Sequence, residues 1–302
     1  MKKIHITYYK KQYCVETRDK RFLYRTFYIL LLSLICKFLY AEQRNGFTAR
    51  IGIGADYIQH KARTTNINGV AMSLNGELGW IWRDYAKINF LISHGAGPND
   101  IKGEYPINAT NLSNLSFSGG LFYVIRLESK GGYNIASAFG HWEHTCYINV
   151  GLETTSLLHA ATYVPYLTSM DIVNAFVELE RRKSIGEKWS IEYLGRLSVS
   201  NATLTLGAST ANIIQTQKEL TSQNIFGYGV KVGLGIHYKF SKRAYFFTNV
   251  LVTYQFINKA EPKTLTTKAT PETNGIQANQ TSIVQYPDSN TLYTGLQFGF
   301  GF

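Results

Sequence analysis

Beyond Gly46 the chain alternates apolar and polar residues with a period of two, in segments of about 9 to 15 residues. Between Val70 and Trp82, bulky apolar residues occupy nearly every second position, and small or polar residues stand between them. Successive side chains of a strand point to opposite faces, so each such segment predicts a strand with one apolar face. The segments are also long enough for a tilted strand to cross a bilayer.

Ten strands follow from this pattern. Their expected ranges are Phe47 to Gln59, Val70 to Trp82, Tyr85 to Ser93, Leu115 to Leu127, Tyr133 to Gly140, Asp171 to Lys183, Trp189 to Ser200, Ile225 to Phe240, Ala244 to Ile257 and Thr291 to Phe302. An even count places both ends of the barrel chain on one side of the membrane. Tyr147 to Leu152 also alternates, and an added pair of strands there would give twelve.

The connections between these strands alternate between short and long. Four are short: Arg83-Asp84, Glu128 to Gly132, Ser184 to Lys188, and Ser241 to Arg243. Five are long: His60 to Gly69, Gly95 to Asn114, His141 to Ser169, Asn201 to Asn224, and Asn258 to Asn290. Transmembrane barrels have short periplasmic turns and longer extracellular loops, whereas a soluble β-sandwich shares the alternation within strands but has no reason for this rule. We therefore predict an all-β fold, a closed antiparallel up-and-down transmembrane β-barrel.

Proline gives an independent check on the strand ranges, because it cannot donate a ladder hydrogen bond. All six prolines fall in the expected long connections: Pro98, Pro106, Pro165, Pro262, Pro271 and Pro287.

The first 41 residues differ from the rest of the chain. Eight basic residues, Lys2, Lys3, Lys10, Lys11, Arg18, Lys20, Arg21 and Arg25, precede an apolar run from Phe27 to Cys36. That run has the length of a signal-peptide core, and Leu39-Tyr40-Ala41 gives a cleavage site before Glu42. We expect residues 1–41 to be a basic leader and cleaved signal peptide, and residues 42–302 to be the barrel with five long extracellular loops. The alternative is an uncleaved membrane anchor.

The formal net charge of +11 is mostly a property of this leader, so nucleic acid is not an expected partner. Removing the leader also removes Cys14 and Cys36 and leaves Cys146 alone. No disulfide framework is therefore expected to stabilise the exported chain.

The last segment places Leu292, Thr294, Leu296, Phe298, Phe300 and Phe302 on one face and stops at the terminal phenylalanine. It resembles the C-terminal assembly signal of Gram-negative outer-membrane β-barrel proteins. The resemblance implies that Leu296, Phe298, Phe300 and Phe302 are recognised by the barrel-assembly machinery. It also implies closure against the strand starting at Phe47, and contact with outer-membrane lipid and lipopolysaccharide.

A narrower similarity, to outer-membrane proteins of Helicobacter and its relatives, lies in Ala41-Glu42 followed by Gly46-Phe47 and a glycine-spaced first strand.

Charged residues gather on the face opposite the apolar one. They are Arg50, Asp56, Glu77, Lys87, Arg126, Glu178, Glu180, Glu192, Arg196, Lys231 and Lys239. Lone charges in a narrow lumen are costly to desolvate, so they are expected to pair. Two interpretations stay open: a structural plug of ion pairs, or a selective pore. The glycines that recur from Gly227 to Gly235 are expected to leave lumen space opposite bulky partners.

Aromatic residues stand beside the short turns, where they predict a girdle at the periplasmic interface. They are Trp80, Trp82, Tyr85, Trp189, Tyr238, Phe240, Tyr245 and Phe246. The alternative is that these are ordinary aromatics at strand ends.

One cluster resembles a chemical site: His141, Glu143 and His144, beside Cys146, at the outer end of the fifth expected strand. Imidazole and carboxylate in this spacing could bind a metal or transfer protons. His60 and His94 would also lie near the outer rim. Histidines at loop ends are common in any barrel, so we expect no catalytic residue, metal site or cofactor.

The favoured function is a non-enzymatic surface protein whose loops serve adhesion to host or cell-surface ligands. The alternatives are a small porin-like channel and an outer-membrane hydrolase with a histidine-rich rim site.

Overall fold

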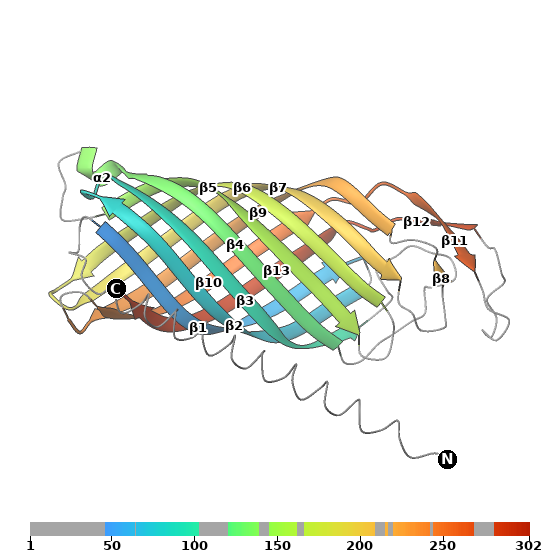
Figure 1. Cartoon of the computed structure of the whole chain (residues 1–302), viewed down its shortest axis with the longest axis horizontal. Coiled ribbons are helices and arrows are strands. Elements are labelled where there is room, and N and C mark those ends of the chain that lie inside the picture. Colours follow the sequence, from blue (N-terminus) through green and yellow to red (C-terminus); the bar gives the residue numbers. More distant parts are fainter. Residues whose placement is uncertain are drawn as a thin grey trace, which may run out of the picture.

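The computed structural model describes residues 46–63, 65–102, 120–138, 145–161, 166–208, 215–216, 220–241, 244–268 and 281–302. Ten strands of this part close into one antiparallel barrel, in the order β1-β13-β10-β9-β7-β6-β5-β4-β3-β2 (Figure 1). The prediction of a closed barrel of ten strands is confirmed. No helix within the described ranges is long and apolar enough to span a membrane.

The strands of the barrel are β1 (Gly46–Ala62), β2 (Thr65–Trp82), β3 (Ala86–Lys102), β4 (Gly120–Asn134), β5 (Thr145–Ala161), β6 (Tyr166–Ile185), β7 (Trp189–Ala208), β9 (Leu220–Lys239), β10 (Tyr245–Ile257) and β13 (Ser289–Gly301). The barrel closes where β1 pairs with β13, from Arg50↔Gly301 to Ala62↔Ser289. Ala49 and Phe302 exchange both backbone hydrogen bonds, so both ends of the barrel chain lie at the same end of the molecule.

The sequence prediction misplaced the fifth strand. Tyr133 to Gly140 was expected to be a strand after a turn from Glu128 to Gly132, but β4 runs through that turn to Asn134 and is followed by the short helix α2 (Ile135–Ala138). The true fifth strand, β5, lies in the segment expected to be a loop. The turn-like residues Glu128 and Lys130 point into the lumen, and their ion pairs offset their poor strand propensity.

Two of the five expected long connections are wrong. His60 to Gly69 belongs to a tight hairpin, since β1 and β2 pair as far as Ala62↔Thr65. Within His141 to Ser169, β5 extends to Ala161 and β6 begins at Tyr166. The strict alternation of short and long connections therefore fails at one end of the barrel. The short turn at Arg83-Asp84 is confirmed: both residues have positive φ, and the amide of Tyr85 donates to the carbonyl of Trp82.

Pro98 lies inside β3, contrary to the prediction. The β2–β3 register runs from Asn66↔Lys102 to Gly69↔Asn99 and resumes at Met72↔Ala96. The ladder is thus interrupted beside the proline, which has no amide hydrogen to donate. Pro262 and Pro287 lie between strands, as expected, whereas Pro106, Pro165 and Pro271 lie outside the described residues.

A second, small sheet stands beyond the barrel at the end opposite the C-terminus (Figure 1). It is formed by β11 (Lys263–Lys268), β12 (Thr281–Val284) and β8 (Gln215–Thr216), in the order β12-β11-β8. Both β11 and β12 belong to the connection between β10 and β13. Since the start of β1 and Phe302 lie at the other end, we call the end with this sheet the outer end and the opposite one the inner end.

Over most of its height the barrel is apolar outside and polar inside. Large apolar side chains stand exposed on the outer wall of every barrel strand, among them Ile53, Leu74, Phe90, Leu127, Val150, Val177, Leu197, Leu234, Val250 and Phe298. Water-soluble proteins do not expose a continuous apolar surface of this size. A closed barrel leaves no strand edge with unpaired backbone groups. Hydrocarbon offers such groups no hydrogen-bond partner, so a sheet that spans a membrane has to close. This part of the barrel, which we call the belt, is therefore built for a lipid bilayer.

Near the outer end the two faces exchange character. The outward residues become polar beyond Tyr57 in β1, where Gln59 and Lys61 follow, and beyond Val173 in β6, where Asp171 follows. Inward residues become apolar at the same level. Adjacent apolar pairs mark the exchange: Tyr57-Ile58, Val70-Ala71, Tyr123-Val124, Ile172-Val173, Ile225-Phe226, Phe256-Ile257 and Leu292-Tyr293. We call the part above this level the collar.

Two apolar clusters fill the collar lumen. One contains Ala62, Met170, Ile172, Ala202, Leu204, Ile225, Ile257, Ala260 and Tyr286, and the other Ile58, Ile67, Ala71, Ile101, Phe122, Val124, Leu157 and Tyr293. Ala260 and Tyr286 come from the β10–β13 connection, so this connection helps to close the outer mouth.

Candidate functional site

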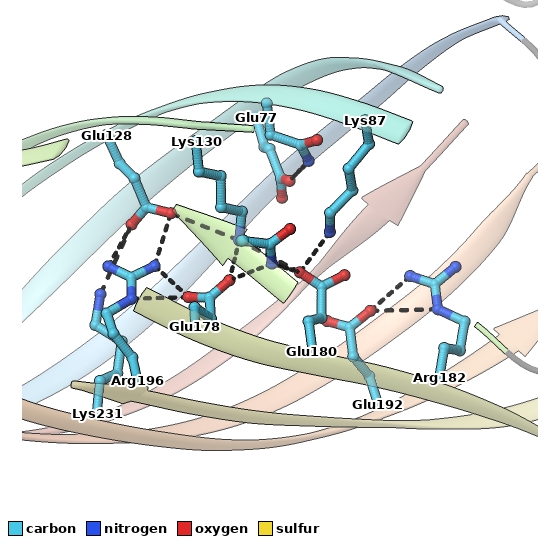
Figure 2. Close-up of polar contacts among 12 residues, drawn as sticks. Glu77, Lys87, Glu128, Lys130, Glu178, Glu180, Arg182, Glu192, Arg196 and Lys231 are labelled. Carbon is cyan, nitrogen blue, oxygen red and sulfur yellow. Dashed lines mark hydrogen bonds and ion pairs between the residues drawn. The ribbon is translucent and has the colours of Figure 1, made fainter. Parts of the chain in front are cut away.

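The candidate site is a network of ion pairs in the inner half of the lumen (Figure 2). It joins six cations, Arg50, Lys87, Lys130, Arg182, Arg196 and Lys231, to six carboxylates, Glu77, Glu128, Glu153, Glu178, Glu180 and Glu192. The formal charges of these twelve side chains cancel. Burying such charges without partners would cost several kcal/mol each, so the pairing is what makes a charged lumen tolerable.

Arg196 of β7 lies at the centre of the network. Its Nη2 and Nη1 donate to Oε1 and Oε2 of Glu128, at 2.8 and 2.9 Å, in a bidentate arrangement. Nη1 also donates to Glu153 at 2.9 Å, and Nε donates to Glu178 at 2.7 Å. The guanidinium also lies over the ring of Phe176, with Cζ 3.6 Å from the ring centroid. A planar fork with five donors suits this position better than lysine would.

Two lysines extend the network from Arg196. On one side, Nζ of Lys231 is 2.6 Å from Oε2 of Glu153. On the other, Nζ of Lys130 is 2.8 Å from Oε1 of Glu178, an oxygen that also accepts from Nδ2 of Asn149 at 2.9 Å. Gly132 makes room for Asn149, because a Cβ atom at Gly132 would lie 1.9 Å from Oδ1 of Asn149. The glycine pair that looked like a turn is therefore part of the packing around the network.

Near the inner mouth a second group surrounds Glu192. Arg50 and Arg182 both donate to Oε2 of Glu192, with N–O distances of 2.9 and 2.6 Å. Nε of Arg50 donates to the hydroxyl of Tyr245 at 2.7 Å, and the Tyr245 ring stacks on His237 with 5.1 Å between centroids. Cζ of Arg50 and Cζ of Arg182 also lie 5.8 and 5.5 Å from the centroid of the Tyr245 ring, so each arginine contacts both a carboxylate and an aromatic ring.

The pairs cross the lumen and do not merely join neighbouring strands. Arg196 of β7 reaches Glu128 of β4, Lys87 of β3 reaches Glu180 of β6 at 2.6 Å, and Arg50 of β1 reaches Glu192 of β7. In each case two or more strands stand between the partners in the barrel order. The network therefore ties opposite walls together and occupies the lumen.

Uncharged polar groups form a layer between the network and the collar. Gln255 donates to the hydroxyl of Ser200 at 2.7 Å, Ser200 donates to Oδ1 of Asn174 at 2.6 Å, and Asn174 donates to Glu153 at 3.3 Å. Nearby, Arg126 lies over the ring of Tyr293, with Cζ 4.5 Å from the centroid. Polarity thus falls in steps from the inner mouth to the apolar collar.

Three cavities formed by described residues lie along the lumen, and the one at the inner mouth is the largest of these three. A cavity of ≈ 360 Å³ opens there between the network and the inner turns and is lined by Arg50, Glu77, Lys87, Arg182 and His237 among others. Further up, cavities of ≈ 90 and ≈ 10 Å³ lie beside Arg196 and Arg126. These three cavities thus become smaller with distance from the inner mouth.

The structure places the predicted lumen residues Arg50, Asp56, Glu77, Lys87, Arg126, Glu178, Glu180, Glu192, Arg196 and Lys231 on the inner face of the wall. Lys239 lines the inner mouth. Sequence reasoning missed Glu128, Lys130, Glu153 and Arg182. The first three were missed because β4 was cut at Leu127 and β5 was read as a loop. Arg182 could have been found from the sequence, because it stands two residues from Glu180 in an expected strand and therefore shares its face.

The glycines of β9 face the lumen beside larger neighbours. A Cβ atom at Gly235 would lie 2.4 Å from Oδ1 of Asn249, and one at Gly229 would lie 2.7 Å from the hydroxyl oxygen of Ser198. These positions thus leave space for side chains of β7 and β10.

Most of the expected aromatic girdle points outward near the inner end, including Trp80, Trp82, Trp189, Phe240 and Phe246. Tyr245 is the exception, because it faces the lumen and binds Arg50. Tyr245 was assigned to the outward girdle together with Phe246, although adjacent residues of a strand point to opposite faces of the wall.

The histidines do not form a shared site among the described residues. His60 is buried in the collar lumen, where its ring nitrogens lie 2.8 Å from the hydroxyls of Thr291 and Tyr286. His94 is on the opposite face of the wall and packs edge-on against Tyr123. His141, Glu143 and His144 lie outside the described residues, as does the predicted leader. Within the described ranges no group of three or more metal-ligating side chains could hold a metal ion.

The final strand presents Leu296, Phe298 and Phe300 to the outside of the barrel, while Tyr293 faces inward. Phe302 pairs through its backbone with Ala49. The apolar face expected from the sequence thus lies on the lipid side of the closing strand.

Neither a protein-family model nor a curated protein matches this sequence. Among solved structures, the outer-membrane protease OmpT from Escherichia coli aligns with a TM-score of 0.53 and 7% identity, over 87% of this chain and 98% of that chain. The translocator domain of the autotransporter NalP from Neisseria meningitidis aligns with a TM-score of 0.39 and 10% identity, over 94% and 97%. Neisserial surface protein A aligns with a TM-score of 0.31 and 12% identity, over 85% and 98%. The OmpT alignment shows that this chain has the fold of an outer-membrane β-barrel.

Proposed function

We propose that the protein is a non-enzymatic surface protein of the Gram-negative outer membrane, a closed barrel that presents its outer connections to molecules outside the cell. The observation that carries this proposal is the filled lumen. Cross-lumen ion pairs occupy its inner half, and apolar clusters occupy its outer half. A barrel filled in this way is a rigid scaffold, and recognition on such scaffolds usually resides in the loops.

The closure of the outer mouth supports this function over a channel. Tyr286 and Ala260 are buried in the collar, and the amide of Ala260 donates to the carbonyl of Tyr286 at 2.9 Å. An ion crossing the lumen would have to leave a hydrated, charged layer and pass an apolar one. Apolar constrictions of this kind exclude water and ions.

Planar-bilayer recordings test the closed scaffold. The purified protein should give no steady channel events, because the apolar clusters of the outer half interrupt the polar path through the lumen. Reproducible conductance steps would favour the porin-like alternative and overturn the proposal.

A loop replacement tests the surface role. The β11–β12 excursion leaves the barrel from a closed base, since Nε2 of Gln285 also donates to the carbonyl of Ala260 at 2.8 Å. Replacing residues 263–284 by two glycines should therefore spare the barrel. Whole cells expressing this variant should bind mucin-coated or extracellular-matrix-coated surfaces several-fold less than cells with the parent protein. Equal binding at equal surface levels would contradict a role for this excursion.

The matched control changes another connection at the outer end, the hairpin between β1 and β2. Replacing Arg63-Thr64 by Asn-Gly retains a tight turn between β1 and β2. This variant should bind as the parent does, and both variants should keep the heat-modifiable gel mobility of a folded barrel.

The hydrolase alternative rests on the predicted rim site of His141, Glu143 and His144, which lies outside the described residues. OmpT is a protease by its name, but at 7% identity the alignment carries no activity to this chain. Cleavage of a peptide library by the purified protein would overturn the non-enzymatic proposal.

The same proposal includes export by the leader of residues 1–41, assembly through Leu296, Phe298, Phe300 and Phe302, and contact with lipopolysaccharide. It includes the narrower resemblance to Helicobacter-type outer-membrane proteins, which rests on Ala41-Glu42, Gly46-Phe47 and the glycine-spaced first strand. Under this proposal the inner end of the barrel faces the periplasm.

A further inference from the structure

Two basic residues near the inner end of β6 point away from the lumen. Glu180 and Arg182 point inward, where they bind Lys87 and Glu192. Because side chains alternate along a strand, Arg181 and Lys183 point outward, and both are exposed. They lie below Leu179, an exposed apolar residue of the same face.

This placement is exceptional within the described strands. Elsewhere in the inner half of the barrel, the outward positions of these strands carry apolar, aromatic or small uncharged residues, for example Ile51, Leu78, Ile88 and Ile236. Among the described strand residues, the inner half of the outer wall thus carries charge at one place, and that charge is positive.

Neither residue has a counter-charge within the described chain. No ion pair or hydrogen bond joins the side chain of Arg181 or Lys183 to another described residue. The six cations of the lumen network are all paired. A charge on the lipid-facing wall is costly at mid-membrane and becomes tolerable near an interface, where an anion is within reach.

The neighbours of the two residues indicate the level of the lipid headgroups. Arg181 stands between Cys146 of β5 and Tyr193 of β7 in the register, and Lys183 stands beside Ile191. Tyr193 and Trp189 are both exposed on this wall, about half of each side chain. Tyrosine and tryptophan favour the headgroup level because their rings are amphipathic.

We propose that Arg181 and Lys183 form a binding site for the phosphate of an anionic phospholipid in the inner leaflet of the membrane. The guanidinium can donate two parallel hydrogen bonds to phosphate oxygens, and the lysine ammonium adds a second positive charge two residues away. Leu179 and Val177, above them on the same face, would lie along the acyl chains. Both kinds of lipid carry one phosphate charge, but the headgroup ammonium of a zwitterionic lipid offsets it and would repel the two cations, so a lipid with net negative charge is favoured.

Native mass spectrometry of the protein purified from the envelope tests this site. Phosphatidylglycerol and phosphatidylethanolamine are added in separate titrations. The parent protein should retain phosphatidylglycerol preferentially. The double variant Arg181→Gln/Lys183→Gln should bind phosphatidylglycerol about tenfold more weakly, because each basic residue contributes to the free energy of binding to an anionic lipid. Millimolar inorganic phosphate should not displace the lipid, because the acyl chains also hold it.

The chain offers a matched control in Lys61→Gln/Lys102→Gln. These lysines are also exposed on the outward face, but at the outer end, and their removal changes the net charge equally. The control should bind phosphatidylglycerol as the parent does. If the double variant does not fold, Lys183→Gln alone, at the strand end, should show a smaller loss of binding.

Equal retention by the parent and the folded variant would overturn the site, as would equal loss in the control. Displacement by inorganic phosphate, or binding of isolated peptidoglycan in place of lipid through these two residues, would overturn the assignment to phospholipid. The titration involves neither the outer connections nor a ligand of the cell surface, so its outcome is independent of the proposed surface function.

Discussion

The belt and the collar use the same ten strands with opposite polarity. In the belt, Leu234 faces out and Lys231 faces in, whereas in the collar Asn201 faces out and Leu204 is buried. The belt buries charge because its outer surroundings are hydrocarbon, and the collar buries apolar surface because its surroundings are water. The rule that apolar groups avoid water is obeyed in both regions. Only the side on which water lies has changed.

The two regions should respond differently to the loss of one inward side chain. Arg196→Met leaves Glu128, Glu153 and Glu178 with less counter-charge in a buried place. We expect a loss of about 3–5 kcal/mol in the free energy of unfolding, measured by denaturant titration in lipid vesicles. Adding Glu178→Gln should recover part of this loss, because it removes one stranded carboxylate. A single variant with parental stability would show that the network does not stabilise the belt.

In the collar the inward residue that matters is apolar. Phe122 is fully buried, at 0% exposed, and Phe122→Ala should cost about 3–5 kcal/mol through lost burial and the cavity that remains. The neighbouring Leu121 faces outward and is 49% exposed, so Leu121→Ala should cost less than about 1 kcal/mol. Similar losses in both variants, in the same unfolding measurement, would contradict an apolar collar core.

A charge added to the outer wall should distinguish the regions as well. Leu234→Arg places a charge on the lipid face of the belt and should cost about 2–4 kcal/mol. Gln59→Arg places the same charge on the outward face of the collar and should change stability by less than about 0.5 kcal/mol. Equal costs would mean that the boundary between belt and collar does not lie between these levels.

The exchange of polarity also explains which part of the fold could be read from the sequence. Alternation locates the belt because its phase is constant there, and nine of the ten barrel strands and the closure followed from it. The count of ten was right although Tyr133 to Gly140 was counted in place of β5. At Tyr57-Ile58 and Ile172-Val173 the apolar positions shift by one, so strands that continue in space appeared to end. The hairpin at Ala62↔Thr65 was therefore read as a long loop.

The candidate site was predictable where its residues lay in uninterrupted strands. Arg50, Glu192 and Arg196 were assigned to the lumen by periodicity alone. Glu128 and Lys130 were not, because a polar stretch ending in Gly131-Gly132 has the composition of a turn. What makes that stretch a strand is the set of partners on β6 and β7, at distances in sequence that no local pattern reveals.

The position of the phase shift along each strand also determines the height of the collar. From Tyr57 to Ala62 a strand advances five residues, which at about 3.3 Å per residue and a tilt of about 40° is roughly 13 Å of height. β7 continues further, from Asn201 to Ala208. The height of the collar thus sets the distance between the outer connections and the hydrocarbon. Moving the apolar pairs by two residues in every strand would raise or lower the outer connections relative to the hydrocarbon without altering the connections themselves.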